Sequence, residues 1–328
     1  MSLFPEQSAQ NRGAITLTGL AAALHFMVDC LCLCCLYLVT AGFTELIRYF
    51  VVYNVLAFLT QPLTGMMADS IRRRHWLLLA SVILLILATL ISSVVWSVCS
   101  SVFLLMTISV LLGLGNSLFH VWGGKETAVN TGNDIRALGV FVSTGAFGLA
   151  VGTVLVSWAL LYGLLISISI VALLYLRTDT RRLHTEVDAD APAANDYSKF
   201  LAWGIVILLM LIVASRSYIG QSFSGNQSKT ALMLIVFGAV TMLGKMAGGW
   251  MVKWMGMTAA IILMLAGIAV CFVFRDVSLG FVLAGLFAVN LTMPVTLYWA
   301  NRMMKGREGL AFGLLAAALI PGYLIAVL

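Results

Sequence analysis

His25 and Asp29 lie four residues apart within an apolar stretch at residues 14–41. In a helix this spacing places both side chains on one face, one turn apart. An ionised carboxylate inside a bilayer costs on the order of 2.5–3.5 kcal/mol, so Asp29 must face a cavity or a partner group. A neighbouring imidazole changes its charge near neutral pH. We therefore interpret His25 and Asp29 as proton-coupling residues. The alternative is a static ion pair or a structural hydrogen bond to a neighbouring helix.

A second polar group lies in the apolar stretch at residues 101–124, where Asn116 precedes His120 by one helical turn and Trp122 follows. Glycines on either side of this group permit close helix packing or local unwinding. We expect Asn116, His120 and Trp122 to face a substrate pocket.

Arg216 lies late in the stretch at residues 200–220 and keeps its charge at every physiological pH. Its guanidinium must therefore find an anion, which is Asp29, an acidic group of a substrate, or a lipid headgroup reached by snorkelling. Asn290 lies one turn before Pro294, which predicts a kink because proline removes a helix hydrogen bond. We expect Arg216 and Asn290 to contact the substrate.

The turn Gly65-Met66-Met67-Ala68-Asp69-Ser70-Ile71-Arg72-Arg73-Arg74 joins two apolar stretches. Three adjacent arginines cost too much to cross a bilayer, so they fix this turn on the cytoplasmic side. Exposed ion pairs are individually weak, which suits a latch that must open in every cycle. The alternative is that the arginines only fix the topology. The expected gating residues are Asp69, Arg72, Arg73, Arg74 and Arg136, with Lys125 and Glu126 as a salt-bridge gate at the cytoplasmic rim.

The composition of the whole chain requires a bilayer around these residues. Of its 328 residues 62% are hydrophobic and 10% are charged, with a mean hydropathy of +1.04. A soluble domain is about a quarter charged. Segments that cross a bilayer must satisfy their backbone groups internally, and apolar stretches of about 20 residues do so as helices. The sequence predicts an all-α polytopic membrane protein with helices at roughly 14–41, 44–68, 75–97, 101–124, 136–156, 158–176, 200–220, 230–252, 257–274, 278–300 and 308–328.

A charged segment at residues 177–199 separates six of these stretches from the other five. It predicts a cytoplasmic linker between an N-terminal bundle at 1–176 and a C-terminal bundle at 200–328. Twelve basic residues fall in the loops on the linker side, and only Arg48, Lys229 and Arg275 fall on the other side. This asymmetry places the linker and the N-terminus in the cytoplasm. The halves also echo each other, because Gly65 and Gly249 each end the second stretch of a half. Parallel repeats of this kind are a known transporter plan.

Several function classes are excluded by what the sequence lacks. The net charge of +6 is spread over short clusters between stretches, so no nucleic-acid surface is predicted. The six cysteines do not have the spacing of a metal or disulfide framework, and the first apolar stretch is too long for a signal peptide. No phosphate-binding loop or hydrolase motif is present. We expect neither an enzyme nor a bound cofactor or metal.

These features together resemble the major facilitator superfamily of transporters. Two segments are further similar to its fosmidomycin-resistance-type branch of exporters, namely His25-Phe26-Met27-Val28-Asp29 and Gly113-Leu114-Gly115-Asn116-Ser117-Leu118-Phe119-His120. Arg216-Ser217 also resembles that branch. The resemblance implies two rocking bundles around a cavity lined by the first, fourth, seventh and tenth helices. Against this pattern of twelve helices, the twelfth is missing.

We therefore predict a secondary active transporter that moves a small organic solute by alternating access and exports it at the expense of a proton gradient. Its expected partners are a small anionic or amphiphilic solute, protons and the lipid bilayer, and the expected state is a monomer in a bacterial inner membrane. Two alternatives belong to other classes: a transport-inactive membrane protein that binds or assembles partners, and a lipid scramblase or flippase. Proton movement that depends on an added solute separates the transporter from both.

Overall fold

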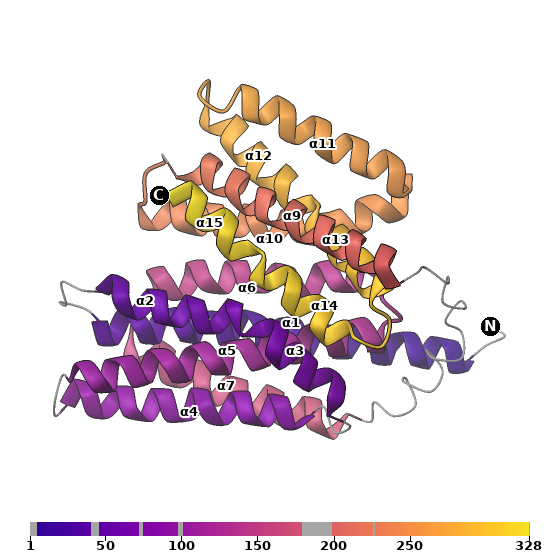
Figure 1. Ribbon diagram of the computed structural model, residues 1–328. Coiled ribbons are helices and arrows are strands. Elements are labelled where there is room, and N and C mark those ends of the chain that lie inside the picture. Colours follow the sequence, from indigo (N-terminus) through magenta and orange to yellow (C-terminus); the bar gives the residue numbers. More distant parts are fainter. Residues whose placement is uncertain are drawn as a thin grey trace.

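The computed structural model describes residues 5–40, 46–71, 75–97, 101–178, 199–225 and 227–327. All regular elements in these ranges are helical, which confirms the predicted all-α fold (Figure 1). Within these described ranges, ten helical segments are long and apolar enough to cross a membrane, and Met257–Val273 is a shorter apolar helix. Arg72, Arg73, Arg74 and most of the predicted linker lie outside the described residues.

The first group of helices comes from the N-terminal half of the chain. It contains α1 (Pro5–Thr40), α2 (Leu46–Asn54), the π-helical turn η1 (Val55–Leu59), α3 (Gln61–Ser70), α4 (His75–Ser97), α5 (Val102–Asn130), α6 (Ile135–Val154) and α7 (Trp158–Arg177). The segments α2, η1 and α3 together make one membrane-length span. Polar side chains are few on their outer faces, which carry exposed Leu, Ile and Val residues suited to contact with lipid.

The second group follows residue 199. It contains α9 (Lys199–Ser224), α10 (Ala231–Met255), α11 (Met257–Val273), α12 (Leu279–Leu291), α13 (Met293–Met303), α14 (Glu308–Ala317) and α15 (Leu319–Val327). The span formed by α12 and α13 is interrupted at Thr292, two residues before Pro294, where the sequence predicts a kink.

Helices α1 and α6 pack against each other more closely than large side chains would allow. A Cβ atom at Gly148 would overlap the carbonyl oxygen of Phe26, and one at Gly152 would overlap that of Cys30. Small residues spaced along one helix face are the usual means by which membrane helices bring their backbones together. This contact fixes the position of the part of α1 that contains His25 and Asp29.

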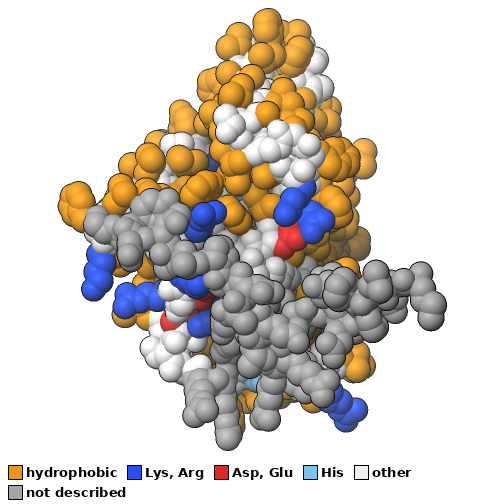
Figure 2. Space-filling model, turned by 90° about the vertical axis from the view of Figure 1, so that its right-hand side faces the viewer, with side chains coloured by type: hydrophobic (Ala, Val, Ile, Leu, Met, Phe, Trp, Pro, Cys, Tyr) orange, Lys and Arg blue, Asp and Glu red, His pale blue; other side chains and the backbone are white. Residues whose placement is uncertain are grey.

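The two groups of helices lie side by side and meet mainly where α6 packs on α10 and where α3 packs on α14 (Figure 1). We call the end of the molecule where α7 ends and α9 begins the linker end. Basic side chains gather at this end, whereas the flanks are hydrophobic (Figure 2). The boundaries of the two bundles at residues 176 and 200 remain a prediction.

Candidate functional site

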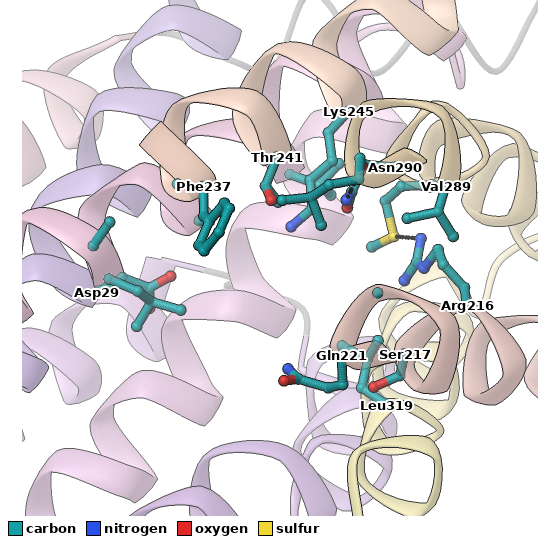
Figure 3. Close-up of a pocket in the computed structure, with 18 of the residues that line it drawn as sticks. Asp29, Arg216, Ser217, Gln221, Phe237, Thr241, Lys245, Val289, Asn290 and Leu319 are labelled. Carbon is teal, nitrogen blue, oxygen red and sulfur yellow. Dashed lines mark hydrogen bonds between the residues drawn. The ribbon is translucent and has the colours of Figure 1, made fainter. Parts of the chain in front are cut away.

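A cavity of about 490 Å³ lies between the two groups of helices. It extends from Asp29, in the middle of α1, to Ser224 and Lys229 at the end of the molecule opposite the linker end. Its walls come from α1, α5, α6, α9, α10 and α12 to α15, and Figure 3 shows polar side chains facing it from several of them. A volume of this size is typical of sites for small organic ligands.

Two histidines and one carboxylate form a buried cluster on the wall made by α1 and α5. The Nε2 atoms of His25 and His120 are 2.9 Å apart. Asp29 places one carboxylate oxygen 3.4 Å from Nε2 of His25 and the other 3.6 Å from Nε2 of His120. All three residues line the cavity, although each is less than a tenth exposed. The structure thus brings together the two expected proton-coupling residues and one expected substrate contact.

The hydrogen bonds around this cluster determine which ring nitrogens carry protons. Nδ1 of His25 lies 2.7 Å from the carbonyl oxygen of Phe141, and Nδ1 of His120 lies 2.9 Å from that of Asn116. A carbonyl oxygen only accepts, so both Nδ1 atoms must be protonated donors. Two neutral rings would then face each other with a lone pair on each Nε2. A hydrogen bond between them requires one further proton, and the carboxylate of Asp29 neutralises the charge that this proton adds.

Asn116 and Gly145 complete the surroundings of the cluster. Asn116 donates from Nδ2 to a carboxylate oxygen of Asp29 at 2.7 Å. It therefore supports the cluster and is absent from the cavity lining, contrary to the expectation that it faces substrate. A Cβ atom at Gly145 would overlap both His25 and Asp29, so α6 leaves no spare space behind the cluster.

Two cations face the cavity from the second group of helices. Arg216, on α9, is 7% exposed, and its guanidinium contacts the sulfur of Met293. Lys245, on α10, is half-buried and also lines the cavity. Arg216 does not pair with Asp29, and its position on the cavity excludes snorkelling to lipid headgroups. Sequence reasoning missed Lys245, although a single lysine within the apolar stretch 230–252 is itself a signal of a functional site.

The linker end is closed by contacts between the two groups of helices. The two carboxylate oxygens of Asp69 accept hydrogen bonds from the backbone amides of Gly309 at 3.0 Å and Leu310 at 2.9 Å, in the first turn of α14. The positive end of the helix dipole favours a carboxylate at this position. Lys125 donates to the same carboxylate at 2.7 Å, and the backbones of Gly65 and Gly309 are in close contact.

Two further hydrogen bonds at the linker end join the turn between α5 and α6 to α13. The side-chain amide of Asn133 donates to the carbonyl oxygen of Tyr298 at 3.1 Å, and Asn301 donates to Asn133 at 2.9 Å. A Cβ atom at Gly249 would meet the carbonyl oxygen of Ile135. Gly65 and Gly249, which occupy corresponding positions in the two halves of the sequence, thus each pack against the first turn of a helix from the opposite half. Gly65 packs against α14, and Gly249 packs against α6.

Arg136 does not join the latch at Asp69, and that expectation is corrected. Its guanidinium pairs with Asp134 at 2.6 Å and lies 5.3 Å from the ring centroid of Trp250. Burial acts to raise the pKa of Asp134, but the hydrogen bonds and charge of Arg136 outweigh it and hold that pKa below its usual range. Arg136 is therefore held next to the contact of Gly249 with α6.

Lys125 and Glu126 do not form the expected gate with each other. Lys125 is buried and pairs with Asp69, whereas Glu126 accepts from the hydroxyl group of Tyr175 at 3.2 Å inside the first group of helices. Trp122 does not face the pocket either, because it is buried against Tyr175. Asn290 lines the cavity (Figure 3), and its contact with a substrate stays a prediction.

The cluster of His25, Asp29 and His120 is also the one group among the described residues whose ligand atoms are close enough to hold a metal ion. These atoms lie within 4.8 Å of one another. Because a single shared proton already accounts for the short distance between the rings, a metal is not needed to explain the geometry.

No known family model matches the sequence, and no curated protein matches it. Solved structures do match. The structure is similar to a single-residue variant of the E. coli fucose:proton symporter FucP with a TM-score of 0.58, 12% identity and coverage of 95% of this chain and 90% of the other. FucP in the outward conformation matches with a TM-score of 0.61 and 12% identity, over 96% of this chain and 91% of the other. A bacterial homologue of the iron transporter ferroportin, in an outward-facing state, matches with a TM-score of 0.55 and 16% identity, over 95% of this chain and 92% of the other. The chain therefore has the fold of the major facilitator superfamily transporters.

Proposed function

We propose that this protein is a secondary active transporter that moves a small organic solute by alternating access and couples its movement to protons. The observation that carries the proposal is a cavity that reaches one end of the molecule, while the other end is closed where Asp69 of α3 accepts hydrogen bonds from the first turn of α14. The fold, which is shared with transporters, supports the same mechanism. In the proposed cycle the contacts at the linker end break, and the cavity closes at the opposite end.

The coupling proton resides on the cluster of His25, Asp29 and His120. Both Nδ1 atoms are already occupied by hydrogen bonds to carbonyl groups, so the exchangeable proton is the one between the two Nε2 atoms. The cluster lines the cavity, which gives this proton a route to water. Loss of the proton leaves two lone pairs opposed and Asp29 without a neighbouring positive charge, so the deprotonated cluster must rearrange.

The direction that we propose is export from the cytoplasm across a bacterial inner membrane, by a monomer whose linker end faces the cytoplasm. Export is supported by the resemblance to the fosmidomycin-resistance-type branch. The orientation is supported by the excess of basic residues in the loops of the linker side.

The test begins with metabolite profiling of cells with and without the gene, which supplies the solute. Purified protein is then reconstituted in vesicles, and proton movement is followed with an internal pH-sensitive dye after solute is added. We expect solute-dependent proton flux that falls at least tenfold in Asp29→Asn and His120→Gln. His75→Gln is the matched control, because His75 opens α4 and lies outside the cavity lining.

Three outcomes would contradict the proposal. Proton flux that is absent with every accumulated solute supports the transport-inactive alternative, and movement of labelled lipid without solute supports a scramblase. Flux that is lost on treatment with a chelator and restored by a divalent transition metal would place a metal ion, instead of a proton, between the histidines.

A further inference from the structure

The cavity contains more positive charge than negative charge among the described residues that line it. Arg216, Lys229 and Lys245 are cationic, and Asp29 is the single carboxylate in the lining. Lys229 lies at the mouth, where its amine donates to the carbonyl oxygen of Ser224 at 2.7 Å. The excess charge in the interior of the cavity therefore rests on Arg216 and Lys245.

Asp29 forms no ion pair with either of these two cations. Its carboxylate is engaged by His25, His120 and Asn116, and Figure 3 shows Arg216 on the opposite side of the cavity. No carboxylate of a described residue forms an ion pair with Arg216 or Lys245. The two positive charges also repel each other.

An unpaired charge away from bulk water is costly, and proteins normally pair it. Arg216 is 7% exposed, and the contact that its guanidinium makes is with the neutral sulfur of Met293. A structural role would supply a neighbouring acid, as Asp69 does for Lys125 and Asp134 does for Arg136. The missing partner of Arg216 and Lys245 is thus expected to come from the occupant of the cavity.

We infer that Arg216 and Lys245 form a binding subsite for the acidic group of an organic anion, a carboxylate or a phosphate. This inference names the substrate class of the proposed transporter and rests on that proposal for its biological meaning. The planar guanidinium binds such a group through two parallel hydrogen bonds, and the ammonium adds a point charge. Phe237, Leu286 and Val289 line the same cavity and provide an apolar surface for the uncharged part of the solute.

Binding to purified full-length protein in detergent tests the subsite without requiring transport. The probes are glutarate, phenyl phosphate and, as an isostere of glutarate with opposite charge, 1,5-diaminopentane. We expect both anions to raise the unfolding temperature in a saturable manner and the diamine to have no such effect. A stronger response to phenyl phosphate or to glutarate decides between the two acidic groups.

The variants Arg216→Met and Lys245→Met should each weaken anion binding at least tenfold, and Lys245→Arg should retain it. Lys253→Met is the matched control, because Lys253 lies two turns further along α10 and outside the cavity lining. Lys245→Met should also unfold at a higher temperature than the unmodified protein when no anion is present, since it removes an unpaired cation. A merely misfolded variant would unfold at a lower temperature.

Failure of both anions to bind, or equal binding by Lys245→Met, would overturn the inference. Proton-coupled flux of a neutral or cationic solute would also overturn it while leaving the proposed function intact. Conversely, anion binding that depends on Arg216 and Lys245 without any proton-coupled flux would retain the subsite and refute the transporter.

Discussion

Nε2 of His25 and Nε2 of His120 face each other at 2.9 Å across the boundary between α1 and α5. The opposite nitrogen of each ring is tied to a backbone carbonyl oxygen, so neither ring can turn over without losing a hydrogen bond. A pair of imidazoles held in this way has the geometry to share one further proton between the two Nε2 atoms. The carboxylate of Asp29 lies beside both rings and compensates the added charge.

The protonation of this pair can be read directly by nitrogen NMR. The chain contains four histidines, so labelling with ¹⁵N-histidine and assignment by single substitution are practical. We expect both Nδ1 atoms of His25 and His120 to be protonated and one further proton to be shared between the Nε2 atoms. His75 is the internal reference, since it lies outside the cluster. Observation of an Nε2-protonated neutral tautomer with an unprotonated Nδ1 in either ring would contradict the arrangement.

Gly145→Ala should disrupt the cluster without changing any of its residues. The added methyl group would overlap His25 and Asp29, and such overpacking costs about 1–3 kcal/mol when the surroundings cannot move. We expect the unfolding temperature to fall and solute-dependent proton flux to be lost.

Gly163→Ala is the control for this change, because a Cβ atom at Gly163 on α7 meets no atom within 4 Å. If Gly145→Ala transports as well as Gly163→Ala does, the cluster does not need its present geometry.

Asp69→Asn should loosen the closed linker end. The substitution removes a charged acceptor from the first amides of α14 and leaves the buried ammonium of Lys125 without its carboxylate. Hydrogen bonds to charged groups contribute about 1.5–3 kcal/mol, so the closed state should lose roughly tenfold or more in population. Hydrogen exchange at Gly309 and Leu310, measured by mass spectrometry, should accelerate accordingly.

Asp276→Asn provides the comparison, because Asp276 is an exposed acid that pairs with the neighbouring Arg275 far from α14. Unchanged exchange at the start of α14 in Asp69→Asn would show that the backbone contacts alone keep the linker end closed.

Asp134→Asn should destabilise the protein in a manner that depends on pH. The pKa of Asp134 is lowered in the folded state, so its contribution to stability is present above the unfolded value of about 3.9. That contribution is lost as the pH falls through the lower folded value. The difference in unfolding temperature between the variant and the unmodified protein should therefore be constant near neutral pH and shrink below about pH 4. A difference that persists unchanged in acid would exclude the ion pair with Arg136 as its cause.

The sequence predicts the part of the candidate site's geometry that is encoded within one helix. His25 and Asp29 share a face because they are one turn apart, and the cost of an intramembrane charge requires a cavity or partner for Asp29. The same argument applied to Lys245 would have placed it on the cavity. Lys245 is the one charged residue within the apolar stretch 230–252, and this isolation is the signal that marks it.

The expectations for Trp122 and Arg136 are wrong, although the spacing of nearby residues in the sequence already argues against both. Trp122 follows His120 by two residues, a rotation of about 200° at 3.6 residues per turn, so the two side chains point to opposite sides of α5. Arg136 was expected at Asp69, but Asp134 is two residues away and forms the cap of α6. Because Asp134 is so close in sequence, it engages the guanidinium of Arg136 and leaves it unavailable to Asp69.

The pairing of His25 with His120 across α1 and α5 could not be derived from one sequence. It depends on the relative rotation of two helices, which is set by the whole interface and in particular by the contact of α6 with α1 at Gly148 and Gly152. The same holds for the position of Asp69 at the start of α14, because the two residues involved are more than 200 positions apart.

At two points of the closed linker end, main chain meets main chain directly, namely at Gly65 with Gly309 and at Gly249 with Ile135. Such contacts require only the absence of a side chain at one position and place no demand on the chemistry of the neighbouring residues. At these two points the packing of the helices can persist while the neighbouring side chains change. Contacts of this kind help to explain how one fold can be shared with proteins of only 12–16% sequence identity.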